Sequence, residues 1–189
     1  MDDLIGTQTP LLRIADAAGA LRALEEAAPA IADLKRPAPA GVDWPAVEQA
    51  LGTALPADFK LLTEQYPSLI VGGTLFVGSP QVGAEHSWVD ATLEELEIVE
   101  QWCEDANLAV RLQPFPALGG LLPWGSTDWG DYLLWSTTGA DPSDWTVTVA
   151  TRNGAWWHYE GGMVQFLAEI IDGTLEQWAL HTIRPEVTG

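Results

Sequence analysis

An Asn-Gly dipeptide at residues 153–154 constrains the fold of this chain more than any other sequence feature. It separates two runs of strand-forming residues, 146–151 and 155–159, and Asn-Gly between such runs is typical of a two-residue turn that joins antiparallel strands. The register set by this turn pairs Val149 with His158. His158 is therefore expected to lie half-buried on the same sheet face as Val149, and it shows no spacing typical of a metal ligand.

Tryptophan is unusually frequent in and around this hairpin. Of the ten tryptophans in 189 residues, six lie between residues 124 and 157. Because each indole buries a large apolar area, we expect most of them in the core. Trp156 and Trp157 are neighbours on a strand and must face opposite sides of the sheet. One of the two is therefore expected to be exposed, or to be covered by the N-terminal segment.

The apolar periodicity elsewhere predicts helices before and after a group of strands. We expect a helical hairpin over 43–66, helices over 92–106 and 163–172, and strands over 74–77, 121–122 and 132–135. Helices followed by mostly antiparallel strands and a closing helix favour an α+β fold, with helices packed on one side of a mostly antiparallel sheet.

The N-terminal residues have a composition of their own. Between Pro10 and Pro29, one helix face can be formed by Leu11, Leu12, Ile14, Leu21 and Leu24. The Pro-rich stretch 35–41 then has the composition of a linker. We predict an N-terminal helical appendage and linker over 1–41, one domain over 42–180, and a C-terminal tail over 181–189.

The acidic excess limits the partners that the chain can bind. Asp and Glu number 27 against 8 Lys and Arg, so the net charge is -19. This charge argues against nucleic acid and against anionic membrane surfaces, and it favours a cationic partner or a strongly solvated surface. The single cysteine, Cys103, excludes an internal disulfide and a multi-cysteine zinc site. With an amino end that carries no basic residues, it favours the cytoplasm.

Three sequence motifs occur in a characteristic order along the chain. They are Trp44-x-x-Val47-Glu48-x-x-Leu51-Gly52-x-x-Leu55-Pro56-x-Asp58-Phe59-Lys60, then Leu122-Pro123-Trp124-Gly125 with Gly130-Asp131, then Trp156, Trp157 and Tyr159 before Phe166-Leu167. In this order the chain resembles the Smi/Knr branch of the SUKH superfamily over residues 42–175. The resemblance makes the predicted domain at 42–180 a SUKH-like one.

This resemblance implies a protein-binding module that is not an enzyme and holds no cofactor. Bacterial SUKH proteins are typically immunity proteins, which neutralise a polymorphic toxin, often a nuclease, by direct binding. We therefore expect steric and electrostatic occlusion of a basic toxin domain. Two alternatives stay open: a small hydrolase that uses turn carboxylates, and a regulatory scaffold protein without a toxin partner.

The predicted helix over 92–106 has an acidic face. Counted at 100° per residue, one arc holds the apolar Ile98, Val99, Trp102 and Cys103. The other arc holds five carboxylates, those of Glu94, Glu97, Glu100, Glu104 and Asp105. No Lys or Arg occurs between Lys60 and Arg111, so this face is either a solvated surface or a docking surface for a cationic partner. Cys103 is expected to be a buried structural thiol.

Further carboxylates lie in two turns. The pairs are Asp128 with Asp131, on either side of Trp129-Gly130, and Asp141 with Asp144. Aspartates in such turns cap the backbone, contact a partner, or do acid/base chemistry. We place Asp128, Trp129, Asp131 and Asp144 in the predicted partner-binding set, with no catalytic residue and no metal site.

Overall fold

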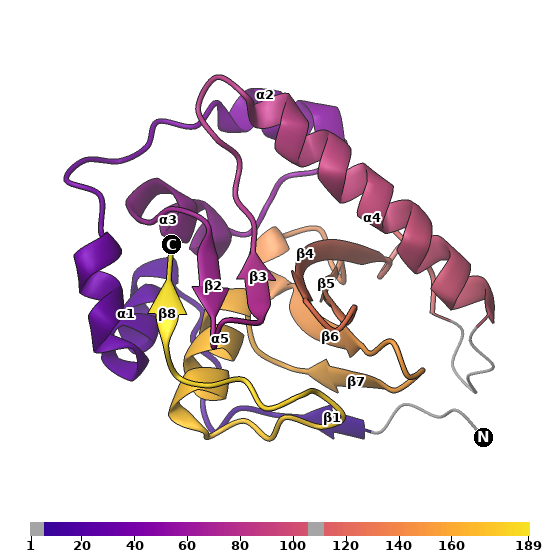
Figure 1. Cartoon of the computed structure of the whole chain (residues 1–189). Helices are drawn as coiled ribbons and strands as arrows, with labels where there is room; N and C mark the ends of the chain where they lie inside the picture. The colour runs from indigo at the N-terminus through magenta and orange to yellow at the C-terminus, as the bar shows by residue number, and fades with distance from the viewer. Residues whose placement is uncertain (1–5, 106–111) are drawn as a thin grey trace.

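The computed structural model describes residues 6–105 and 112–189, and these form an α+β fold around one curved, open sheet (Figure 1). The sheet order is β1-β7-β6-β5-β4-β3-β2-β8. The strands are β1 (Gly6–Gln8), β2 (Leu69–Val71), β3 (Leu75–Val77), β4 (Leu121–Thr127), β5 (Tyr132–Ser136), β6 (Thr146–Ala150), β7 (Trp156–Tyr159) and β8 (Val187–Thr188). Neighbouring strands are antiparallel except for β1, which runs parallel to β7. The predicted α+β class with a mostly antiparallel sheet is confirmed.

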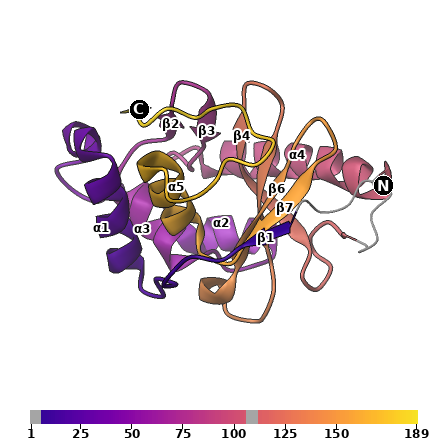
Figure 2. The same ribbon diagram turned by 90° about the horizontal axis from the view of Figure 1, so that it is seen from below.

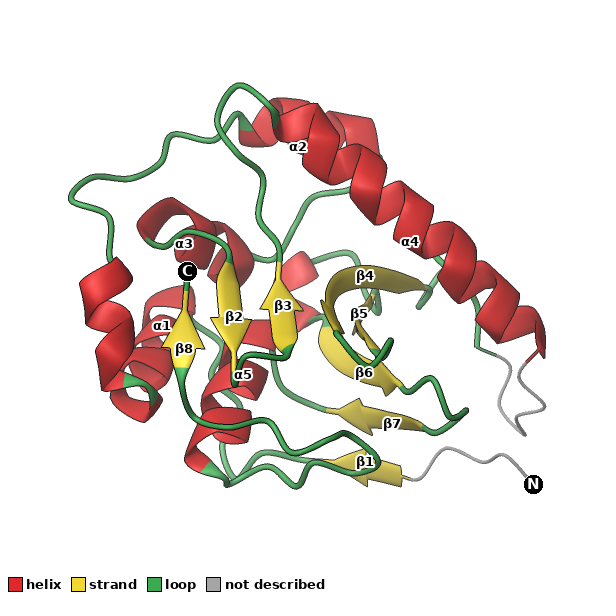
Figure 3. Ribbon diagram, viewed as in Figure 1, coloured by secondary structure: helices red, strands yellow, loops and turns green. Residues whose placement is uncertain are grey.

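Five α-helices accompany the sheet in the described residues (Figure 3). They are α1 (Ala17–Ala27), α2 (Trp44–Leu51), α3 (Ala57–Gln65), α4 (Glu85–Asp105) and α5 (Met163–Asp172), with short 3-10 helices at Pro29–Leu34 and Pro142–Asp144. The hairpin predicted over 43–66 is α2 and α3, and α5 has the predicted bounds. Helix α4 begins seven residues before the predicted start, and the predicted end at Ala106 lies outside the described residues.

The two faces of the sheet are covered differently. Helices α1, α3 and α5 lie on the face that carries Trp135 and Trp157, where they form the main core. The second half of α4 lies on the other face, where Val99 packs with Leu134 and Trp156 in a smaller cluster. Figure 2 shows α1 and α4 on opposite sides of the molecule. Both Trp156 and Trp157 are therefore buried, and the expectation that one is exposed or covered by the N-terminal segment is wrong, because α4 covers Trp156.

The segments at both ends of the described chain belong to the same core. Strand β1 extends the sheet beside β7, and Leu24 and Ile31 are fully buried against the main cluster. At the other end, Val187 of β8 is buried and pairs with β2. The predicted division into an appendage over 1–41, a domain over 42–180 and a tail over 181–189 stays a prediction. In the described residues, segments from all three ranges contribute to one core or to its sheet.

Helix α1 is shorter than the predicted apolar face. It begins at Ala17, because Asp16 caps it by accepting a hydrogen bond from the Gly19 backbone N–H at 2.6 Å. Leu11 and Leu12 precede the cap and are 100% and 78% exposed, so they do not share a helix face with Leu24.

The β6–β7 hairpin has a longer loop than predicted. Thr151 pairs with Ala155 through its backbone N–H, and Gly154, at φ 82°, donates to the Thr151 carbonyl. This is a three-residue loop with glycine in the left-handed position. The register therefore shifts by one residue, and His158 pairs with Thr148 instead of Val149. His158 is half-buried as expected, but it lies on the opposite face from the one predicted.

Candidate functional site

The inward face of α4 is held by packing. Val89 and Val99 are buried, and Trp102 makes edge-to-face contacts with Tyr132 and Trp156, at ring-centroid distances of 5.3 and 6.4 Å. Cys103 packs beside them and is half-buried, so it is less enclosed than predicted. Burial and the nearby charge of Glu100 raise the pKa of the Cys103 thiol to about 11, which keeps it protonated and unreactive at neutral pH.

The outward face of α4 carries the predicted glutamates. Glu94, Glu97, Glu100 and Glu104 are all exposed, whereas the side chain of Asp105 lies outside the described part of the structure. The sequence of α4 contains no Lys or Arg. In the described residues the ion pairs are Lys35–Glu25 and Lys60–Glu48, both at 2.7 Å, and neither involves α4.

Two apolar side chains accompany these glutamates. Leu93 and Ile98 are each 39% exposed. Ile98 was predicted on the buried arc, but it is exposed and does not belong to the cluster that Val99 forms with the sheet. The outward face of α4 is thus mixed: four exposed carboxylates beside two partly exposed aliphatic side chains. We call this set of six residues the α4 surface.

Glu95 differs from the four exposed glutamates of the α4 surface. It is half-buried, and the loss of solvent raises the pKa of its carboxyl. Its charge in turn contributes to the raised pKa of Tyr132, after the burial of that phenol. Glu95 therefore belongs to the packed side of the helix and not to the α4 surface.

The predicted turn residues do not form one site. Asp131 is 3% exposed, and its carboxylate accepts hydrogen bonds from Thr127 Oγ1 at 2.8 Å and from the Arg152 backbone N–H at 3.0 Å. One oxygen is thus used within its own turn and the other by the β6–β7 loop, while its place in the partner-binding set stays a prediction. Asp128 is exposed, and half-exposed Trp129 stacks on His181 with a ring-centroid distance of 4.0 Å.

Asp144 is exposed but lies at the other end of β5 from this turn. The structure therefore separates Asp144 from Asp128 and Trp129 by the length of a five-residue strand, roughly 17 Å. Asp131, which the hydrolase alternative would pair with Asp128, already accepts from one side-chain hydroxyl and one backbone N–H.

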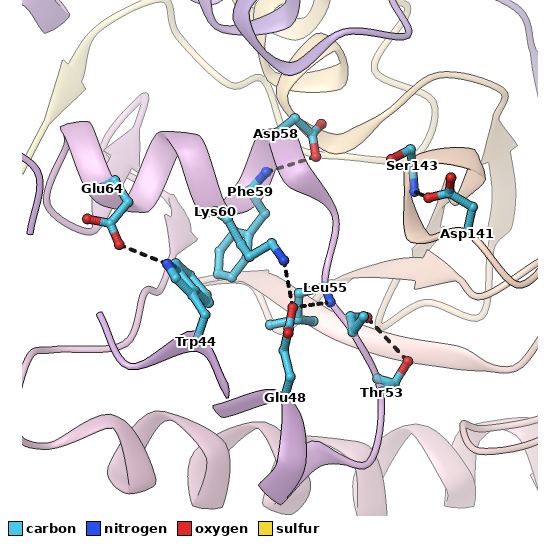
Figure 4. A network of polar contacts seen from close by, with 11 residues as sticks. Trp44, Glu48, Thr53, Leu55, Asp58, Phe59, Lys60, Glu64, Asp141 and Ser143 are labelled. Carbon is cyan, nitrogen blue, oxygen red and sulfur yellow. Dashed lines mark hydrogen bonds and ion pairs between the residues drawn. The ribbon is translucent and has the colours of Figure 1, made fainter. Parts of the chain in front are cut away.

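The residues that carry the family resemblance hold helices and loops together (Figure 4). Glu48 Oε1 accepts from Lys60 Nζ at 2.7 Å and from the Leu55 backbone N–H at 2.9 Å. Trp44 Nε1 donates to Glu64 at 2.8 Å. Asp58 accepts from the Val164 backbone N–H at 3.2 Å, at the start of α5, and burial raises the pKa of its carboxyl. Each polar side chain here has a structural partner.

The structure also has a cavity that was not predicted from the sequence. On the same sheet face as Trp156, beside the area that α4 covers, Ser136, Thr148 and His158 form a chain in which both side-chain hydrogen bonds are 2.6 Å long. Burial lowers the pKa of His158, so its ring is neutral at physiological pH. These strands and the loop around Leu118 line a cavity of about 370 Å³. Strand register decides which side chains meet there. The predicted register paired His158 with Val149, so it did not bring His158 beside Thr148 and Ser136.

No protein-family model matches this chain, and no curated protein is similar enough to count as a relative. Within the described ranges, no three His, Cys, Asp or Glu residues gather as they would to hold a metal ion. The described helices also include none that is long and apolar enough to span a membrane.

Proposed function

We propose that this protein is a cytoplasmic binding module of the SUKH immunity type, which neutralises a basic toxin domain by covering its active or substrate-binding surface. The α4 surface is the observation that carries the proposal. Its four exposed glutamates stand on one helix without a Lys or Arg among them. Like charges at helical spacing disfavour the helix slightly, and a cationic partner would relieve this repulsion.

The α4 surface combines two contributions to binding. A field of carboxylates raises the rate at which a cationic partner arrives, and it disfavours partners of the same sign. The partly exposed Leu93 and Ile98 offer apolar area that a partner can bury, which charge alone does not supply. A regulatory scaffold would use the same surface on another basic protein, and this is the alternative that the surface favours next.

The proposal expects a gene for a toxin with a basic domain beside the gene for this protein, and co-expression with that domain tests it. The wild-type protein should restore growth, and Glu97→Lys with Glu104→Lys should abolish protection. The matched control is Asp33→Lys with Glu186→Lys, which makes the same change of charge at exposed positions outside α4. A wild-type protein that gives no protection contradicts the immunity function. Equal loss of protection in both variants places the effect in overall charge and not in the α4 surface.

A further inference from the structure

The loop before α1 presents two neighbouring leucines to solvent. Leu11 is 100% exposed and Leu12 is 78% exposed, the first and third most exposed of the large apolar side chains in the described residues. Contiguous exposed apolar side chains on a folded protein mark interaction sites more often than single ones do.

This loop is fastened on both sides of the leucines. Before them, Thr9 Oγ1 donates to Glu160 at 2.6 Å. After them, the Arg13 guanidinium donates to the backbone carbonyls of Glu160, Ser143 and Trp145 at 3.1 to 3.2 Å. The exposure of the leucines is therefore built into the fold and does not come from an unattached loop.

A buried amide holds the loop at the leucines themselves. Gln165 of α5 is 2% exposed. Its Nε2 donates to the Leu12 carbonyl at 2.8 Å, and its Oε1 accepts from the Ile14 backbone N–H at 2.9 Å. The leucine side chains are thus held outward against a fixed backbone, which lowers the entropy cost of binding to them.

The leucines stand beside a groove between α1 and α5. The groove has a volume of about 430 Å³, within the usual 300–1,000 Å³ of binding pockets, and its floor includes Ala23, Ala27 and Ala168. The charged residues among its lining are Glu26 on α1 and Glu169 and Asp172 on α5. Carboxylates therefore flank the apolar floor on both helices. We call this feature the α1–α5 groove.

We propose that the α1–α5 groove docks an amphipathic helix of a basic protein, with aliphatic side chains against Leu11 and Leu12 and Lys or Arg beside the carboxylates. Helices commonly bind in this way, with one apolar face laid into a groove. A second copy of this chain is a poorer occupant, because its net charge of -19 would bring like charges together. The α1–α5 groove and the α4 surface have no residue in common, and α1 and α4 lie on opposite sides of the molecule (Figures 1 and 2), so this docking does not depend on the proposed function.

The test uses a fluorescent amphipathic peptide of leucine, alanine and lysine, about four turns long, and a matched peptide with glutamate in place of lysine. The full-length protein should bind the lysine peptide and not the glutamate peptide. Leu11→Ser with Leu12→Ser should weaken binding at least about tenfold, because the apolar contact is lost from two exposed positions that the fold does not need. Glu26→Lys with Asp172→Lys should also weaken it.

Leu118→Ser is the matched control, because Leu118 is 91% exposed and lies outside the groove. It should bind the lysine peptide as the wild type does, and amide NMR shifts should map the peptide to α1, α5 and the loop between Pro10 and Ile14. Equal binding by the wild type and the double leucine variant would overturn the proposal, as would shifts that map to α4. A wild-type dimer that the leucine substitutions dissociate would overturn it in favour of a second copy.

Discussion

Helix α5 is ten residues long and eight of these are buried, whereas only Val89, Thr92 and Val99 are buried among the described side chains of the 21-residue α4. Helix α5 lies between the sheet and helices α1 and α3, so packing accounts for almost every position in it. Helix α4 contributes one narrow face to the fold. Its outward glutamates are not explained by packing, and for this reason we look there for binding.

The largest expected effect concerns the N-terminal segment, whose helix α1 packs against α5. Deleting residues 1–40 removes β1, α1 with the fully buried Leu24, and the 3-10 helix at Pro29–Leu34 with the fully buried Ile31. Each such side chain contributes about 1.5–3 kcal/mol by burial, against a total stability of about 5–15 kcal/mol. We expect residues 41–189 to lose cooperative thermal unfolding, measured by circular dichroism. A sharp transition in the shortened chain would contradict this expectation and support the predicted appendage over 1–41.

A pair of single substitutions compares the two helices directly. Phe166→Ala in α5 removes a fully buried ring that contacts Trp124, Trp157 and Tyr159, and it should cost about 3–5 kcal/mol. Ile98→Ala on the α4 surface should stay within about 0.5 kcal/mol. Urea denaturation gives both values. Similar losses of stability for the two variants would contradict the view that α5 is fixed by packing and the α4 surface is not.

The start of α5 depends on one buried carboxylate. Asp58→Ala leaves the Val164 backbone N–H without its acceptor and should cost about 1–2 kcal/mol. Burial raises the pKa of Asp58, so its contribution is full below the ordinary aspartate pKa and is reduced as the pH rises through the raised value. The loss on substitution should therefore be larger in acid than at neutral pH. A loss that grows with pH would contradict this assignment.

His158 should give a smaller, pH-dependent effect on the uncovered part of the sheet. Burial lowers its pKa, so the folded protein favours the neutral ring. Stability should fall as the pH decreases through about 6.5, where the unfolded chain begins to take up the proton. His158→Gln should lack this share of the pH dependence, measured as the difference in urea midpoints between the two proteins. Parallel curves for the two proteins would mean that the ring is solvated.

Sequence periodicity predicted α5 to the residue, because its apolar face, its start after Gly162 and its end at Gly173 agree with one another. It failed where the hydrogen bonds of a turn or a helix cap decide the outcome. The one-residue shift of His158 came from the Thr151–Ala155 pairing, and the exposure of Leu11 came from a cap at Asp16. The outward glutamates of α4 were predicted because a charged face needs no partner within the chain. The burial of Asp131 was not predicted, because its two donors, Thr127 and Arg152, lie in separate loops of the sheet.

The most direct test of the account is the rate at which a basic toxin domain associates with the α4 surface, measured against salt concentration. The wild-type rate should fall steeply once the Debye length drops below about 10 Å, and Glu97→Lys with Glu104→Lys should slow association about tenfold or more. The stability of this variant should stay within about 0.5 kcal/mol of the wild type, because both positions are exposed. A rate that responds neither to salt nor to the two reversals, in a variant that remains folded, would contradict the account and leave the α4 surface as a solvated helix face.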